Sequence, residues 1–67
     1  MSTKFEKDLK LMETDIDEGI VMLRERKAEL DWIEREGRAC HNRFRLECLA
    51  QEWNRLKCEY DILDQMI

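Results

Sequence analysis

The feature that most constrains this chain is an alternating three-and-four spacing of mostly apolar residues, which occurs twice. In the second half it joins seven positions: Leu46, Leu49, Trp53, Leu56, Tyr60, Leu63 and Ile67. In the first half it joins seven more: Met12, Ile16, Gly19, Leu23, Arg26, Leu30 and Ile33. This spacing is typical of the face that one helix presents to another in a coiled coil. The sequence therefore predicts an all-α protein with two amphipathic helices.

The two series are mirror images about a point between Ala39 and Cys40. Folding the chain there pairs each member of one series with a member of the other, for example Leu30 with Leu49. We therefore expect an antiparallel two-helix hairpin, coiled-coil-like, as a single domain over residues 1–67. One straight helix is the alternative. In that case the heptad phase of the second series would be shifted from that of the first by two residues, which an insertion of three or four residues alone does not produce.

Capping residues predict where the helices begin and end. Thr3 and Glu6 have the spacing of a capping box at a helix start. Gly37 is suited to a left-handed C-cap, and Asn42 is a favourable N-cap. The expected elements are a first helix over about 3–36, a turn over about 37–42 and a second helix over about 43–66.

Two residues interrupt the first series, and the mirror places both opposite aromatic side chains. Gly19 would give room for the Tyr60 ring across the seam. Arg26 would lay its guanidinium over the Trp53 indole in a cation–π contact. We interpret both as core packing, with ligand binding by Arg26 or Trp53 as the alternative.

Apolar residues also continue beyond the predicted seam. Because Met12 already pairs with Ile67, Phe5 and Leu9 extend past the last partner within the chain. They form either a frayed end or a surface that another chain covers.

A second apolar line lies to the side of the seam, as if each helix packed on two neighbours. Its members are Leu11, Val21, Ala28, Trp32, Phe44, Cys48, Cys58 and Ile62. We therefore expect the hairpin to pack with another chain into a helical bundle. The candidate partner-binding residues are Phe5, Leu9, Trp32, Phe44, Cys48 and Ile62.

Composition argues against several classes of protein. No apolar run is longer than five residues, so neither a membrane span nor a signal-peptide core is expected. The three cysteines, Cys40, Cys48 and Cys58, are too far apart to pair within one regular helix. Free thiols suit a reducing compartment, and we expect a cytoplasmic protein. A partner is expected because a lone hairpin of 67 residues buries little apolar surface.

The distribution of charge argues against nucleic-acid binding. The net charge is −4, and a segment of +2 over residues 24–45 separates segments of −3 on either side. Acidic residues interrupt the basic ones in the middle segment, which weakens any phosphate-binding surface. The acidic open end of the hairpin would be either a solvated face or an imitation of nucleic acid.

Catalysis is not expected either. His41 is the one histidine, and the sequence contains neither a nucleophile placed with a base nor a glycine-rich phosphate loop. The cysteines have no C-x-x-C spacing and no histidine cluster beside them. We therefore expect no enzyme activity, no metal, no cofactor and no small-molecule substrate.

The stretch Gly37-Arg38-Ala39-Cys40, followed by Phe44 and the second apolar series, resembles the small co-chaperones of type III secretion needle subunits in Gram-negative bacteria. The resemblance extends to total length and to a turn just past the middle, and covers roughly the second half of the chain. Two Trp and three Cys depart from that pattern. The resemblance implies binding to a helical-repeat chaperone in the cytoplasm, which would keep a needle subunit soluble.

Taken on its residues, the chain is expected to be a non-enzymatic helical protein–protein interaction module. It would bury an apolar helix face in a groove of its partner. The alternatives are a small phage or mobile-element protein that inhibits a host factor and a structural homodimeric coiled coil.

Overall fold

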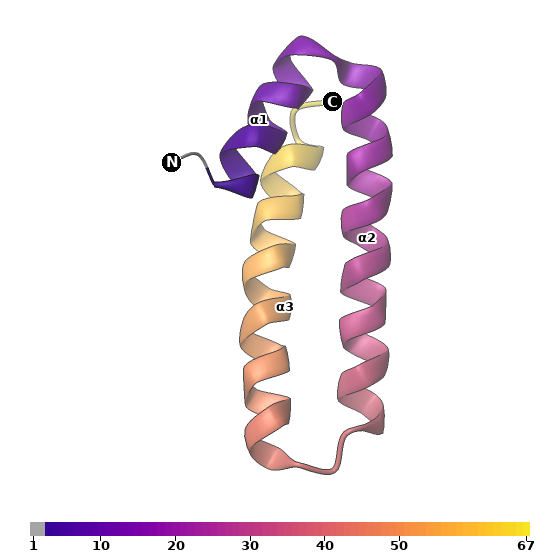
Figure 1. Ribbon diagram of the computed structural model, residues 1–67, viewed down its shortest axis with the longest axis vertical. Coiled ribbons are helices and arrows are strands. Elements are labelled where there is room, and N and C mark those ends of the chain that lie inside the picture. The colour runs from indigo at the N-terminus through magenta and orange to yellow at the C-terminus, as the bar shows by residue number, and fades with distance from the viewer. Residues whose placement is uncertain (1–2) are drawn as a thin grey trace.

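The computed structural model describes residues 3–67, which form three helices and no strand. The helices are α1 (Lys4–Thr14), α2 (Ile16–Ala39) and α3 (Arg43–Asp64). The two long helices, α2 and α3, run antiparallel side by side, and α1 folds back against the open end of this pair (Figure 1). The all-α class is confirmed, but the predicted two-helix hairpin carries a third helix.

The prediction of one helix over residues 3–36 is wrong, because the chain reverses at Asp15. Its backbone is non-helical, with φ −146° and ψ 89°. The Asp15 N–H donates to the Leu11 carbonyl and closes α1, while its carboxylate accepts from the Glu18 N–H at 3.3 Å and caps α2. Asp15 and Glu18 have the same capping-box spacing as Thr3 and Glu6, so the sequence contained a second helix start.

The other helix ends follow the predicted caps at two of three places. Thr3 accepts from the Glu6 N–H at 3.1 Å, and the Asn42 side chain accepts from the Arg45 N–H at 3.2 Å. Gly37 is not a left-handed cap, since no residue within 3–67 has a positive φ. Instead α2 continues to Ala39 and ends in an extended residue, Cys40.

The register of the hairpin differs from the mirror prediction by about one helical turn. Residues 40–42 join α2 to α3, so the turn centres on His41 rather than between Ala39 and Cys40. A Cβ added to Gly37 would lie 3.9 Å from Leu46 Cδ2. The mirror had placed Leu46 opposite Ile33, four residues earlier on α2. The length of the turn, which helix periodicity does not encode, causes this difference.

The core is complete only where three helices meet. Its buried cluster comprises Met12, Met22, Leu23 and Leu63, with Leu9, Leu11 and Tyr60 partly buried against it. Toward the turn, α2 still buries Leu30 and Ile33, but α3 buries none of its apolar residues fully there. Two helices alone cannot enclose a seam on all sides.

A glycine allows α1 to approach α2 closely. Gly19 is buried, and a Cβ added to it would lie 2.5 Å from Met12 Sδ. The predicted role of Gly19, to give room for Tyr60 across the seam, is therefore corrected: the side chain that fills its space comes from α1.

Candidate functional site

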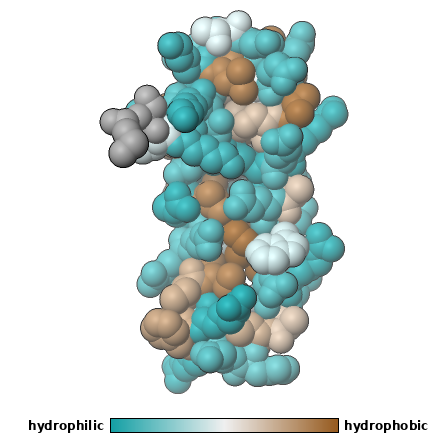
Figure 2. Space-filling model, in the orientation of Figure 1, coloured by the Kyte–Doolittle hydropathy of each residue, from teal (hydrophilic) through white to brown (hydrophobic). Residues whose placement is uncertain are grey.

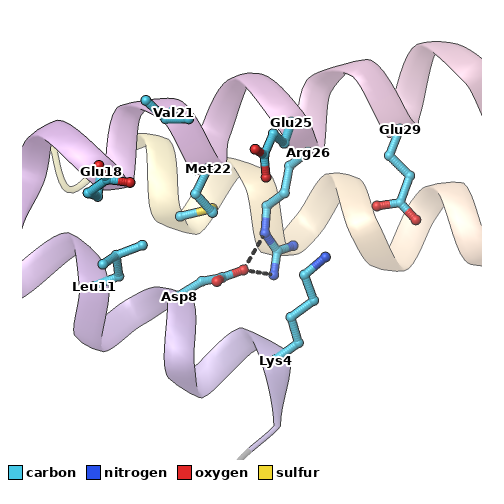
Figure 3. Close-up of a pocket in the computed structure, with 9 residues that line it drawn as sticks. All are labelled: Lys4, Asp8, Leu11, Glu18, Val21, Met22, Glu25, Arg26 and Glu29. Atoms are coloured by element: carbon cyan, nitrogen blue, oxygen red, sulfur yellow. Dashed lines mark hydrogen bonds and ion pairs between the residues drawn. The ribbon is translucent and has the colours of Figure 1, made fainter.

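A buried ionic cluster ties the three helices together. The Arg26 side chain, on α2, is only 4% exposed. Its Nε donates to Asp8 Oδ2 at 2.8 Å, and its Nη2 lies 2.6 Å from the same oxygen. Its Nη1 donates to Glu59 Oε1, on α3, at 3.1 Å. Figure 3 shows Asp8 and Arg26 reaching toward each other across the gap between α1 and α2.

This cluster corrects the expected cation–π contact between Arg26 and Trp53. Among the described residues, the cation–π contact found is that of Lys57 Nζ over the Tyr60 ring, at 5.3 Å from its centroid. A desolvated guanidinium gains more from carboxylate acceptors than from a ring face. The Trp53 indole Nε1 is buried without a hydrogen-bond partner.

Sequence reasoning missed Asp8 and Glu59, the two anionic partners of Arg26. The signal available was indirect: an arginine in an apolar series requires acceptors wherever it is buried. Asp8 lies one turn before Met12 on the same, buried side of α1, which made it a candidate acceptor.

Two shallow grooves flank the cluster. One, of about 290 Å³, lies between α1 and α2 and includes Lys4, Glu18, Glu25 and Glu29. The other, of about 340 Å³, lies between the start of α1 and α3. Neither groove brings a nucleophile together with a base, and the part of the chain that the structure describes holds no group of three His, Cys, Asp or Glu able to bind a metal.

The surface pairs elsewhere are ordinary helical ion pairs. Arg38 contacts Glu34 at 2.7 Å, and Lys57 Nζ contacts Asp61 Oδ1 at 2.7 Å. The hydrogen bond to Asp61 raises the pKa of Lys57 above its ordinary value. Such exposed pairs contribute little to stability.

Two of the predicted partner-binding residues are covered by their own chain. Because α1 folds back, Phe5 and Leu9 do not extend past the last contact within the chain, so that premise is wrong. Both side chains are half-buried: Phe5 lines the groove beside Leu56, and Leu9 packs against the core. The reversal at Asp15 is the physical reason.

The other four predicted partner-binding residues lie at the surface. Trp32 is 54% exposed, Phe44 75% and Ile62 51%, and Cys48 is also exposed. Phe44, Cys48 and Ile62 share one side of α3, whereas Trp32 lies on α2. Figure 2 shows apolar residues along the line between the two long helices, framed by hydrophilic ones.

The side of the hairpin on which α1 packs is covered for only part of its length. α1 has 11 residues and α2 has 24, and the start of α1 reaches the level of Glu29 and Arg55. Trp32 follows Glu29 by three residues on that side of α2. Phe44 lies three turns before Arg55, on the side of α3 that faces away from α2. Past the start of α1, therefore, one side of the α2–α3 pair, here called the open stretch of the α2–α3 groove, has no third helix over it within residues 3–67, and Trp32 is exposed beside it.

Comparison of the chain with protein-family models, with curated proteins and with solved structures found no match. Over residues 3–67, none of the helices combines the length and apolar character that crossing a bilayer requires.

Proposed function

We propose that this chain is a non-enzymatic protein–protein interaction module that binds an amphipathic helix of a partner protein. The partner helix lies in the open stretch of the α2–α3 groove, in line with α1. The observation that supports this most directly is that α1 covers only one part of this side of the hairpin and leaves Trp32 exposed beside the rest.

The energetics favour a helix as the occupant. A third helix buries apolar surface at the open end of the hairpin, and a partner helix would do the same toward the turn. Large aromatic residues such as Trp32 often dominate the free energy of binding at interfaces.

The charge near the turn defines the chemistry of the partner. Residues 35–45 contain four arginines and a single acidic residue. A partner helix with an apolar face and acidic edges would therefore be oriented by these arginines. The resemblance to co-chaperones specifies one version of this proposal, in which a helical-repeat chaperone supplies the helix. The free thiols fit the cytoplasm as the compartment.

The test begins with affinity capture from the native cell through a C-terminal tag, followed by identification of the captured protein. Titration of its purified helical segment against the chain then measures the dissociation constant. Trp32→Ala should weaken binding by at least about fivefold, which corresponds to about 1 kcal/mol, without loss of helicity. Ile16→Ala is the matched control, because Ile16 is 42% exposed but lies at the opposite end of the hairpin.

The proposal fails if Trp32→Ala binds as tightly as the unmodified chain, or if Ile16→Ala weakens binding equally. The identity of the captured protein separates the co-chaperone role from that of an inhibitor of a host factor.

A further inference from the structure

The outer side of α3 carries an exposed row of residues at steps of four and three. The row, here called the α3 outer row, consists of Phe44, Cys48, Gln51, Arg55, Cys58 and Ile62. All six are exposed, and the two ends of the row are its largest apolar residues, Phe44 at 75% and Ile62 at 51%. Within residues 3–67 no helix packs over the row, although Arg55, near its middle, borders the groove beside the start of α1.

The α3 outer row is symmetric about its midpoint: apolar residues stand at both ends, and a cysteine stands next to each of them. Its centre is at the level of Trp53, so the two apolar ends are equidistant from the centre. Cys48 and Cys58 are equidistant from it as well. A twofold interface requires a surface of this kind, in which each residue meets the counterpart at the mirrored position.

From this symmetry we infer that a second copy of the chain packs on the α3 outer row, with the two α3 helices antiparallel. Phe44 of each copy then meets Ile62 of the other. Cys48 of each copy meets Cys58 of the other, near the distance that a disulfide spans.

The charges at the two ends of α3 support the antiparallel orientation. Arg43 and Arg45 lie in the first turn, which has no acidic residue, while Asp61 and Asp64 lie in the last turn, which has no basic residue. Both placements are unfavourable with respect to the dipole of α3 itself. In the antiparallel pair, each arginine end lies beside the aspartate end of the other copy, whereas a parallel pair would bring like charges together.

One like-charged pair remains in this arrangement, because Glu47 of each copy faces Glu59 of the other. Glu59 is already bound to Arg26 and Arg55, and its side chain is only 20% exposed. Its negative charge is therefore largely compensated within its own chain.

The second copy and the partner helix of the proposed function use different residues. Ile62 belongs only to the α3 outer row, and Trp32 belongs only to the α2–α3 groove. The self-association therefore does not depend on the proposed function, and the two can fail separately.

The first test is oxidation by diamide of the Cys40→Ser chain, which retains only Cys48 and Cys58. Each disulfide forms from two thiols, whose two electrons and two protons reduce diamide to its hydrazine. The expected product is a covalent dimer in which peptide mapping identifies links between Cys48 and Cys58.

Two further variants in this background decide the orientation. Cys48→Ser and Cys58→Ser should each lose the covalent dimer, since like cysteines of an antiparallel pair lie about 15 Å apart along the helix axis. An equimolar mixture of the two variants should regain it, because each supplies the cysteine that the other lacks. A covalent dimer of either variant alone, or none in the mixture, overturns the proposal.

A second test needs no oxidation. Sedimentation of the reduced chain at micromolar concentration should show a dimer, and Ile62→Glu should raise its dissociation constant at least about tenfold. Trp32→Glu is the matched control and should leave the dissociation constant unchanged. A monomer in the reduced state, or equal weakening by both substitutions, overturns the proposal.

Discussion

Replacing Asp8 with alanine should weaken the packing of α1 against the hairpin. Asp8 makes two contacts with Arg26, at 2.8 and 2.6 Å, from a side chain that is 12% exposed. The substitution removes both contacts and leaves the guanidinium buried with Glu59 as its remaining partner, at 3.1 Å.

The magnitude follows from the burial of the pair. A hydrogen bond to a charged group contributes about 1.5 to 3 kcal/mol, and a buried charge left without any partner costs about 3 to 5 kcal/mol. Because Glu59 remains, we expect Asp8→Ala to lower the free energy of unfolding by about 2 to 3 kcal/mol. For a chain of 67 residues, this lowers the Tm by about 10 to 20 °C.

Thermal melts followed by circular dichroism measure this loss. Amide hydrogen exchange shows whether it is confined to α1. Asp31→Ala is the matched control, since Asp31 is exposed on α2 and its removal should change stability by less than about 0.5 kcal/mol.

A double-mutant cycle tests the cause. With Arg26→Met, which removes the buried cation, Asp8→Ala should cost less than about 1 kcal/mol. If Asp8→Ala costs the same in both backgrounds, Asp8 acts independently of Arg26 and the reasoning about the ionic cluster is wrong.

Four other substitutions test the packing of the helices. Gly19→Ala should destabilise the chain by about 1 to 2 kcal/mol, because the added Cβ would displace Met12. Gly37→Ala should stabilise it by about 0.5 to 1 kcal/mol, because alanine favours the helix more than glycine does and the added Cβ meets no close atom. Chemical denaturation of both variants measures the difference. Leu63→Ala should cost about 2 to 5 kcal/mol in the same assay, because Leu63 is completely buried and its loss leaves a cavity. Trp53→Phe should cost less than about 1 kcal/mol, since it removes a buried indole N–H that has no acceptor; a loss above about 2 kcal/mol would show that Nε1 is satisfied in solution.

Helix periodicity predicted which sides of the helices are buried. Six of the seven positions in the first series are buried, including Arg26, and the exception is Ile16 at 42% exposure. The second series was predicted less well, because only Leu63 is fully buried and Ile67 is 67% exposed. Periodicity shows which side of a helix is apolar, but the extent of its burial depends on how many neighbours surround it.

The position of α1 depended on tertiary contacts that no local pattern encodes. The apolar series passes from Met12 to Ile16 without a change of phase, so it is compatible with a continuous helix. The cap at Asp15 gives the chain a place to reverse, but the ion pair from Asp8 to Arg26 spans 18 residues of sequence. Among the candidate partner-binding residues, Trp32, Phe44, Cys48 and Ile62 lie on the surface, whereas the reversal partly covers Phe5 and Leu9.

The single residue between α1 and α2 has a consequence for how firmly α1 is held. Closing so short a connection costs little entropy, and it keeps Asp8 at a high effective concentration beside Arg26. A separate peptide of 11 residues would lose translational and rotational entropy on binding, and it would also bear the free-energy cost of forming a helix. Covalent attachment to α2 therefore accounts for much of the stability of α1. The contacts that α1 makes are sufficient because they do not have to offset the entropy cost of bringing two separate molecules together.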